Sequence, residues 1–331
     1  MRAVMVHGFG SAETARIEET ADPRPGPGEV LVEIHATPVN YVDLVTLRGE
    51  YQFRPKLPYT PGKGPAGVVR ELGAGVQDLR VGDRVLAMAE YGGYAELVAV
   101  DQSQVYRLPD TLSFTDAAAM SLAFDTAWMA LRDRARLQTG ESVLVLGASG
   151  AVGTAAVQLA KAMGAGSVLA AVSSPEKFVA LKAMGADEMV DLSRPDLRES
   201  IREQVFAVTG GSGVDVVIDP LGGDPFDGAV RAIAWRGRLV VIGFAAGRIP
   251  TLKLNYVMLK NIEVSGLQIS DYRKRTPELL RDCYREMFEF CSEGRITAPP
   301  VNTFALSDFA TAVQAVEARK NTSRIVLLPR G

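Results

Sequence analysis

A glycine-rich turn between an apolar strand and an amphipathic helix is the group of residues with the clearest chemistry in this sequence. The letters GASGAVG occupy residues 147–153, directly after the run VLVL and before TAAVQLAKAM. Such a turn brings backbone N–H groups and a helix N-terminus close to a pyrophosphate, and its last glycine lets the helix pack on the strand. The pattern is Ala148-x-Gly150-x-x-Gly153, with Ala in place of the usual first Gly. Because a second apolar strand, SVLAAV, follows, we predict a dinucleotide-binding βαβ unit over residues 143–177.

The residues after that second strand indicate which dinucleotide fits. NAD-specific proteins usually carry Asp or Glu about 20 residues after the last glycine, where it binds the ribose 2′-hydroxyl. Here the count reaches Ser173, which is followed by Ser174, and Lys177 lies one helical turn further on. A neutral pocket beside an ammonium group accepts a 2′-phosphate, so we predict NADPH as the cofactor. The alternative is that Lys177 is only a solvated helix residue.

Residue types that bind metals are scarce. The chain contains two Cys and two His (Cys283, Cys291, His7 and His35) and no CxxC motif. A zinc site needs three or four Cys, His or carboxylate ligands, so we expect no metal. The cysteines fall in a stretch with helical spacing, and we expect them to be buried hydrophobic residues rather than a disulfide.

Composition argues against several classes of partner. The net charge of −3 gives no reason to expect nucleic acid or an anionic membrane as a partner. The densest basic run, residues 273–275, is interpreted as a solvated turn. No apolar stretch approaches the roughly 20 residues of a membrane span, and the N-terminus lacks signal-peptide features. We therefore expect a cytoplasmic protein.

The elements that must position these residues follow two patterns. Up to about residue 115, short strands alternate with Pro and Gly turns, which predicts a mainly β, partly open barrel. The expected strands are Arg2–Val6, Val30–Ala36, Ala66–Leu72, Arg84–Ala89 and Ala95–Val100. A helical stretch over Thr115–Arg134, capped by Thr115, follows. From Ser142, apolar strands alternate with amphipathic helices, which is typical of a doubly wound parallel sheet.

The C-terminal part returns to a mixed pattern. We expect helices over Leu279–Ser292 and Ser307–Arg319, the second capped by Ser307 or Asp308, and a last strand over Arg324–Leu328. A length of 331 residues suits about two domains. The chain is therefore interpreted as a Rossmann domain inserted into a mainly β domain.

Motifs over nearly the whole chain resemble those of the zinc-independent quinone oxidoreductases, the zeta-crystallin-like group of the medium-chain dehydrogenase/reductase superfamily. The motifs are VNYVDLVTLRGEY (39–51), LPYTPGKGPAGVV (57–69), VGDRV (81–85), GGYAE (92–96), the loop at 147–153, the stretch around Lys177, DVVIDPLGG (215–223), GRLVVIGF (237–244) and VEARKNTSRIVLLP (316–329). The resemblance implies an α/β fold with a GroES-like mainly-β catalytic domain, residues 1–121 and 268–331. The NADPH-binding Rossmann-type domain, a doubly wound parallel sheet, would span residues 122–267.

The resemblance also implies an activity, which is NADPH-dependent, metal-free reduction of a quinone by hydride transfer. Zinc-dependent relatives carry Gly-His-Glu where this chain has Gly62-Lys63-Gly64. In the resembling family, Asn40 and Tyr51 correspond to polar pocket residues that could donate to the acceptor oxygen. The positions that correspond to cofactor-contacting residues are Thr126, Ser149, Ala151, Val152, Leu221, Phe244, Arg319 and Arg324.

Alternatives remain at several of these positions. Tyr51 is interpreted as a binding residue that could also deliver a proton, or as a loop-packing residue. Arg319 could be a helix-surface charge, and Phe244 could contribute packing alone. Lys63 is either a surface charge or a pocket cation. We expect Asp43 to order its loop or cap a helix rather than to act in catalysis.

Two further departures from the family affect the sites. Val45 replaces a pocket tyrosine of some relatives, and Leu192 replaces a tyrosine near the adenosine phosphate. Tyr91 and Tyr94 flank Gly92-Gly93 and are candidates to line the cleft, although Tyr94 equally suits the core.

Three functions stay open at this point. They are reduction of quinones, reduction of enones, alkenals or enoyl thioesters, and a catalytically silent NADPH-binding protein. The apolar strand Ile262–Leu267 resembles the edge through which family members pair, which predicts a homodimer.

Overall fold

The computed structural model describes residues 1–318 and 323–330 and divides the chain into two compact units. The first unit comprises Met1–Leu122, Arg273–Tyr284 and Thr297–Gly331. The second comprises Ala123–Tyr272 and Arg285–Ile296.

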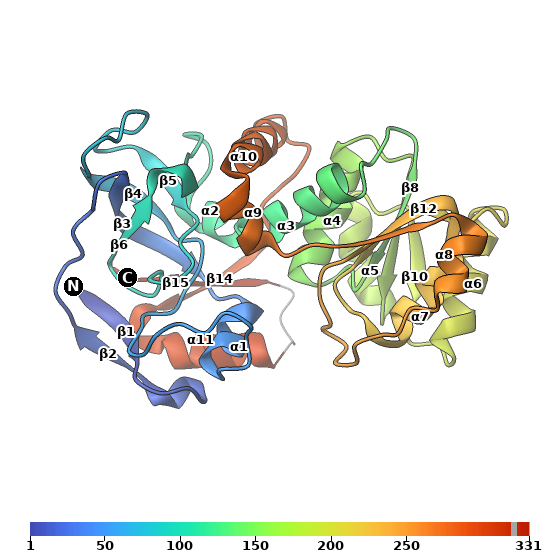
Figure 1. Ribbon diagram of the computed structural model, residues 1–331, viewed down its shortest axis with the longest axis horizontal. Helices are drawn as coiled ribbons and strands as arrows, with labels where there is room; N and C mark the ends of the chain where they lie inside the picture. Colours follow the sequence, from blue (N-terminus) through green and yellow to red (C-terminus); the bar gives the residue numbers. More distant parts are fainter. Residues whose placement is uncertain (319–322, 331) are drawn as a thin grey trace. The chain divides into compact units, whose positions relative to one another are not determined.

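The first unit is mainly β (Figure 1). Its principal sheet has the order β14-β15-β3-β4-β5-β7, with β6 paired to β3, and β1 and β2 form a separate hairpin. Only β14 and β15 pair in parallel; the other ladders are antiparallel. The strands are β1 Arg2–Val6, β2 Ala15–Glu19, β3 Glu29–Pro38, β4 Ala66–Leu72, β5 Arg84–Ala87, β6 Leu97–Asp101, β7 Val105–Arg107, β14 Val301–Ala305 and β15 Arg324–Leu328.

Short helices complete the first unit. They are α1 Tyr41–Leu47, α2 Phe114–Met120 and α11 Phe309–Glu317, with single turns η1 Ala12–Thr14, η2 Gln102–Gln104 and η4 Leu306–Asp308. Apolar residues of α1, α11, β1 and β15, such as Leu44, Val313, Val4 and Ile325, form one buried cluster. This packing holds the start of α1 and the start of β15 close to each other, which matters for the site.

The second unit is built on a six-stranded sheet whose strands are all parallel. The strands are β8 Ser142–Leu146, β9 Ser167–Val172, β10 Glu188–Asp191, β11 Val214–Asp219, β12 Ile233–Val241 and β13 Glu263–Gly266. Their order, β10-β9-β8-β11-β12-β13, is 3-2-1-4-5-6 in chain order, which is the Rossmann topology. The expected doubly wound sheet is therefore confirmed, with its switch point between β8 and β11.

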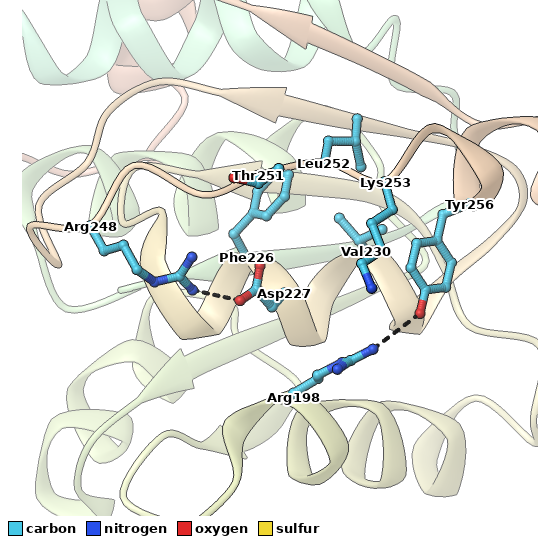
Figure 2. A pocket seen from close by; sticks show the side chains of 9 residues that line it. All are labelled: Arg198, Phe226, Asp227, Val230, Arg248, Thr251, Leu252, Lys253 and Tyr256. Carbon is cyan, nitrogen blue, oxygen red and sulfur yellow. Dashed lines mark hydrogen bonds and ion pairs between the residues drawn. The ribbon is translucent and has the colours of Figure 1, made fainter.

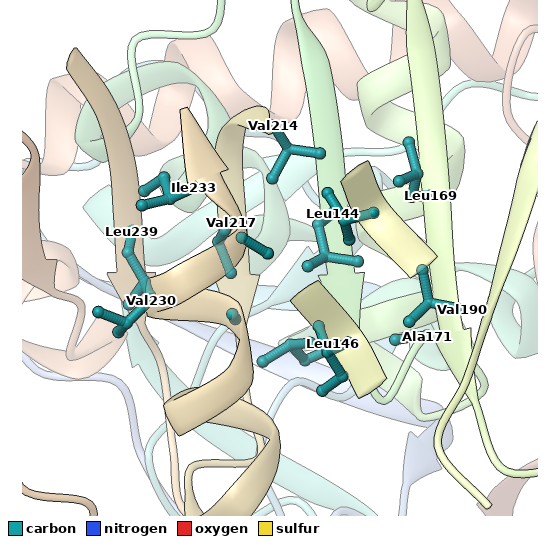
Figure 3. Packing of buried hydrophobic residues seen from close by; sticks show 14 of the residues in the cluster. Leu144, Leu146, Leu169, Ala171, Val190, Val214, Val217, Val230, Ile233 and Leu239 are labelled. Carbon is teal, nitrogen blue, oxygen red and sulfur yellow. The ribbon is translucent and has the colours of Figure 1, made fainter. Parts of the chain in front are cut away.

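Crossover helices cover this sheet and bury its apolar side chains. They include α4 Ala151–Ala162, α5 Pro175–Ala183, α6 Leu197–Val208, α7 Gly223–Ala232 and α8 Leu254–Lys260. Figure 3 shows Leu144, Leu169, Val217 and Leu239 packed in the core that the strands share with α6 and α7. Such a rigid framework fixes the carboxyl ends of the strands, where parallel sheets bind ligands.

The stretch expected as one helix over Thr115–Arg134 is three pieces: α2, α3 Ala123–Met129 and the π-turn η3 Ala130–Arg134. Leu122 has a φ of +62°, which interrupts the helix between α2 and α3. The expected cap at Thr115 is wrong, because Ser113 accepts a hydrogen bond from the backbone N–H of Asp116 at 3.0 Å. Among the described residues, the remaining helices are α9 Ile269–Arg275 and α10 Pro277–Ser292, and none of the described helices has the length and apolar character needed to cross a membrane.

Candidate functional site

The glycine loop of the second unit joins the end of β8 to the start of α4. Gly147 has a φ of +59°, a conformation that favours glycine. A Cβ on Gly153 would lie 2.4 Å from the carbonyl oxygen of Gly147 and 2.6 Å from Cα of Ala148. Glycine is therefore required where the first turn of α4 packs on the loop. Gly150 donates its N–H to the carbonyl oxygen of Gly147 at 2.9 Å, and Thr154 donates to that of Gly150 at 2.8 Å. The N–H groups between them, at the start of α4, have no acceptor within the helix and are available to a phosphate group.

At the end of β9, two of the residues expected at the adenosine ribose lie together. The ammonium Nζ of Lys177 donates to the hydroxyl of Ser173 at 3.1 Å. Ser174 is the N-cap of α5, and its hydroxyl hydrogen-bonds the exposed Glu176 carboxylate, which lowers the pKa of Glu176. The ammonium and hydroxyl groups fit a 2′-phosphate, whereas Glu176 is a neighbouring charge that the sequence interpretation did not weigh.

The ends of β11 and β12 place Leu221 and Phe244 beside glycines. A Cβ on Gly147 would meet Leu221 Cδ2 at 2.8 Å, and one on Gly222 would meet Phe244 Cδ1 at 2.9 Å. Leu221 therefore lies against the glycine loop. The buried carboxylate of Asp219 shapes this turn, since its Oδ1 accepts the backbone N–H groups of Leu221 at 2.9 Å and Gly222 at 2.8 Å. Burial raises the pKa of Asp219 to about 6.

Two other residues, Thr126 and Arg319, were also expected at the cofactor. Thr126 is buried in α3, with its hydroxyl 3.4 Å from Oδ1 of Asp125. Arg319 lies outside the described residues.

In the first unit, Asn40 precedes α1 and is buried. Its backbone N–H donates to Oδ2 of Asp43 at 2.9 Å, and the same carboxylate accepts from the hydroxyl of Tyr94 at 3.0 Å. Burial raises the pKa of Asp43 to about 6, although the Asn40 N–H, the charge of Lys63 and the Tyr94 hydroxyl all favour its ionised form. Asp43 therefore orders the turn into α1, and burial raises the pKa of the Tyr94 hydroxyl well above its ordinary value.

The side-chain amide of Asn40 contacts Arg324. Nη2 of Arg324 donates to Oδ1 of Asn40 at 2.6 Å, and its Nε donates to the carbonyl oxygen of Ala119 at 3.1 Å. Burial lowers the pKa of Arg324 to about 10, so the guanidinium stays charged at neutral pH. Asn40 Nδ2 is buried and has no hydrogen-bond partner among the described residues. Arg324, expected at the cofactor, thus contacts a residue expected at the acceptor.

Lys63 is a buried cation. It is 2% exposed, and its Nζ donates to the carbonyl oxygen of Glu90 at 2.9 Å and to Glu90 Oε2 at 2.6 Å. The other carboxylate oxygen of Glu90 lies 3.3 Å from Nη1 of Arg273, whose side chain is 0% exposed. The expected solvated turn at residues 273–275 is therefore wrong at Arg273, which lies in helix α9 and is buried against the partly exposed carboxylate of Glu90.

Aromatic rings surround Lys63. Its Nζ lies 4.8 Å from the ring centroid of Tyr91 and 5.9 Å from that of Tyr51. Tyr51 also packs edge-on against Phe53 at 6.0 Å. Asn40, Asp43, Lys63 and Tyr51 therefore lie in one region of the first unit. Lys63 is near enough to Asp43 for its charge to lower the pKa of that carboxyl, and Lys63 also contacts the ring of Tyr51.

The histidines do not contribute to this region. His7 Nε2 is paired with Glu18 at 2.8 Å, and His35 Nε2 with Glu33 at 3.2 Å; both side chains are partly or largely exposed. Within residues 1–318 and 323–330, no three His, Cys, Asp or Glu side chains gather as a metal site would require. Cys283 is buried and Cys291 is partly buried, and the two form no disulfide in the described part of the chain.

Figure 2 shows a separate cavity of about 190 Å³ in the second unit, beside α7 and α8. Arg248 is paired with Asp227 at 2.5 Å, and Arg198 donates to the Tyr256 hydroxyl at 3.4 Å. None of the residues expected at a cofactor or acceptor lines it. The cavity is therefore not the candidate site.

Sequence reasoning missed the partners of the buried charges. Glu90 lies in none of the motifs, and it is 183 residues from Arg273 in the chain. Tyr94 and Arg273 were noticed, in the motif GGYAE and in the basic run, but not as partners of buried charges. The one available signal was Lys63 within an otherwise apolar and glycine-rich stretch, because a buried lysine requires a carboxylate partner.

Two family models that match this chain show the class of protein to which it belongs. Residues 26–110 match the family model of the alcohol dehydrogenase GroES-like domain, and residues 151–286 match the model described as zinc-binding dehydrogenase. A GroES-like domain combined with a Rossmann sheet defines the medium-chain dehydrogenases/reductases.

Similar individual proteins show to which group within this superfamily the chain belongs. Quinone oxidoreductase-like protein 2 from Rattus norvegicus is 38% identical over 312 residues, which cover 94% of this chain and 88% of the relative. The quinone oxidoreductase of Pseudomonas syringae pv. Tomato DC3000 superposes with a TM-score of 0.90 at 31% identity, covering 99% of each chain. The Escherichia coli quinone oxidoreductase, solved with NADPH, gives a TM-score of 0.89 at 28% identity, covering 99% of this chain and 100% of that one. The chain belongs to the quinone oxidoreductase-like, or zeta-crystallin-like, group of the medium-chain dehydrogenase/reductase superfamily.

Proposed function

We propose that this protein is an NADPH-dependent oxidoreductase that reduces quinones without a metal ion. The observation that carries the proposal is the amide of Asn40, whose buried Nδ2 has no partner among the described residues. A buried donor without an acceptor is unfavourable in the free protein and suits a ligand oxygen. The quinone oxidoreductases among the similar proteins support the choice of acceptor class.

NADPH, when bound, supplies the hydride, and the protein supplies binding and electrostatics. Ala148–Gly153 would hold the pyrophosphate, and Ser173 and Lys177 the 2′-phosphate. Leu221 and Phe244 would border the ribose and nicotinamide. The NADPH complex of the Escherichia coli relative supports this cofactor.

At the acceptor, negative charge develops on an oxygen, and donors placed there lower the barrier. Asn40 Nδ2 is the proposed donor. Nearby positive charge from Lys63 and Arg324 favours an anionic product, although Asp43 and Glu90 offset part of it. Tyr51 is proposed to border the acceptor through its ring, beside Lys63. A reduced quinone can take its proton from water, so no dedicated acid is required.

Stopped-flow oxidation of NADPH tests the proposal. The panel contains 1,4-naphthoquinone, 9,10-phenanthrenequinone, 2-alkenals and an enoyl thioester. Preferential turnover of the quinones, with a loss of about 100-fold or more in kcat for Asn40→Leu, would support it. Preference for an alkenal or the thioester identifies the alternative enzyme, and tight NADPH binding without any turnover identifies a silent NADPH-binding protein.

We also propose a homodimer that pairs through β13. This strand is an edge of the parallel sheet. An unpaired edge invites another strand, and twofold symmetry lets two identical edges pair. The cytoplasmic location stays a prediction, to be checked by cell fractionation.

A further inference from the structure

We infer that Arg324 is a positioning residue that fixes the orientation of the Asn40 side-chain amide and so directs Nδ2 toward the acceptor oxygen. The inference rests on the proposed function for its catalytic consequence. It assigns Arg324 a role different from the cofactor contact expected from the sequence.

The chemistry of the two groups determines the orientation. An arginine guanidinium has only donors, whereas a primary amide has an acceptor at one end and a donor at the other. With Nη2 of Arg324 at 2.6 Å, the amide must turn its oxygen toward Arg324. Nδ2 is then directed away from the guanidinium, and it is the atom left without a partner among the described residues.

The backbone brings the two residues together and holds them. β15 pairs with β3, and the N–H of Val39 donates to the carbonyl oxygen of Ile325 at 2.9 Å, one residue from each partner. Arg324 is fixed a second time by the carbonyl oxygen of Ala119 at 3.1 Å. Asn40 is fixed by its backbone N–H on Asp43. Because these contacts hold the backbone of Asn40 and the side chain of Arg324 in place, the guanidinium acts on the rotation of the Asn40 side-chain amide.

Without Arg324, the amide loses its charged donor, and only the capping-box contact with the backbone of Asp43 still distinguishes its two ends. Either end could then face the acceptor, and an amide oxygen facing a developing oxyanion is repulsive. Binding of NADPH does not depend on this orientation, so the effect is confined to the acceptor step.

The kinetic test uses Arg324→Met, Arg324→Lys and Asn40→Ala, with 1,4-naphthoquinone as the acceptor. We expect Arg324→Met to lower kcat/KM for the quinone about 10- to 100-fold. This loss is smaller than the loss in rate caused by removing an oxyanion donor altogether, because the donor is misdirected rather than absent. The Kd for NADPH should change less than twofold. Arg324→Lys, which keeps a donor, should recover most of the activity.

A double-mutant comparison separates positioning from an independent role. If Arg324 acts through the amide, adding Arg324→Met to Asn40→Ala produces no further loss. Losses that multiply, or an NADPH Kd that rises tenfold in Arg324→Met, would overturn the inference in favour of an independent or cofactor role.

NMR of the Asn40 side chain tests the inference without any turnover, so the test also applies if the protein reduces no quinone. In ¹H–¹⁵N spectra of the deuterated protein, the Asn40 side-chain NH₂ signals, assigned by their absence in Asn40→Asp, should shift and broaden in Arg324→Met and stay sharp in Arg324→Lys. Unchanged signals in Arg324→Met would refute the positioning role, whereas absent quinone turnover in wild type refutes only the proposed function.

Discussion

Two buried cations of the first unit, Lys63 and Arg273, share one partly exposed carboxylate, that of Glu90. Removing one partner of a buried ion pair leaves an uncompensated charge and typically destabilises a protein by about 3–5 kcal/mol. We expect Glu90→Gln to lower the free energy of unfolding by about 3 kcal/mol, measured by urea denaturation at pH 7. Lys63→Met is the matched control, because it removes a charge and leaves Glu90 with Arg273; a loss as large as that of Glu90→Gln would contradict this account.

The buried carboxylate of Asp219 predicts a pH dependence of stability. Its pKa is about 6 in the folded protein against an ordinary value of 3.8, because burial disfavours the charged form. The folded state therefore binds the proton more tightly, and its stability falls as pH rises from about 4 to 6 and is constant above that.

Asp219→Asn keeps an oxygen for the N–H groups of Leu221 and Gly222 but cannot titrate. Relative to wild type, this variant should gain up to roughly 3 kcal/mol between pH 4 and pH 6, at about 1.4 kcal/mol per unit of pKa shift. Denaturation curves at half-unit pH intervals measure the difference. A stability difference that does not vary with pH would show that Asp219 is not protonated in this range.

Lys177 and Glu176 carry opposite charges beside the proposed 2′-phosphate site, so their substitution should change the affinity for NADPH in opposite directions. If Lys177 binds the 2′-phosphate, Lys177→Ala should raise the Kd for NADPH by about 10-fold or more and leave NADH unaffected, since a hydrogen bond to a charged group contributes about 1.5–3 kcal/mol. Glu176→Gln removes a neighbouring negative charge and should lower the NADPH Kd a few-fold. Fluorescence titration measures both variants, and equal effects on the two dinucleotides would disprove the assignment.

At the scale of elements, α4 packs on the glycine loop so closely at Gly153 that no side chain fits there, whereas Gly150 leaves more space. A Cβ at position 153 would overlap backbone atoms that cannot move aside, whereas one at Gly150 meets only the Gly147 oxygen at 3.3 Å. Gly153→Ala should destabilise the second unit by about 1–3 kcal/mol and weaken NADPH binding at least tenfold. Gly150→Ala is the matched control for stability alone and should destabilise the unit far less, because position 150 itself lies in the loop proposed to hold the pyrophosphate. Thermal unfolding without NADPH checks this, and equal destabilisation by the two variants would contradict it.

Regular elements were predictable where periodicity or turn chemistry is local. The strands at Arg2–Val6 and Arg324–Leu328 have the expected bounds, and the glycine loop lies between β8 and α4 as expected. The break at Leu122 was missed because leucine normally continues a helix and gives no sequence signal for the positive φ that it adopts here. Hydrogen-bonding chemistry between distant residues was also not predictable, since Asn40 and Arg324 are 284 residues apart.

The candidate site was predictable in part. A motif identifies the phosphate loop because its chemistry comes from contiguous backbone. Asn40 was named only through a resemblance, and its orienting partner was assigned elsewhere. Lys63 could not be placed, because whether a lysine is buried depends on Glu90, which carries no sequence signal of its own.

At the scale of the whole molecule, α8 exposes apolar side chains just before the edge strand β13. Leu254, Met258 and Leu259 are 74%, 69% and 68% exposed. If a second copy pairs at β13 and covers this helix, Leu254→Glu with Met258→Glu should convert a dimer into a monomer. Light scattering at micromolar concentration measures the mass. Val179→Glu is the control, because Val179 is equally exposed but lies on α5. A monomeric wild type would refute the dimer.

The pairing of β15 with β3 has a consequence for the order in which the protein is made. The strand that carries Arg324 leaves the ribosome after all of the second unit, so the parallel sheet can form while β3, which also pairs with β4 and β6, still lacks β15. A chain stopped after residue 296 should therefore bind NADPH yet have no competent acceptor pocket. If the proposed function holds, the nascent protein becomes able to bind the reduced cofactor before it can pass a hydride to an acceptor.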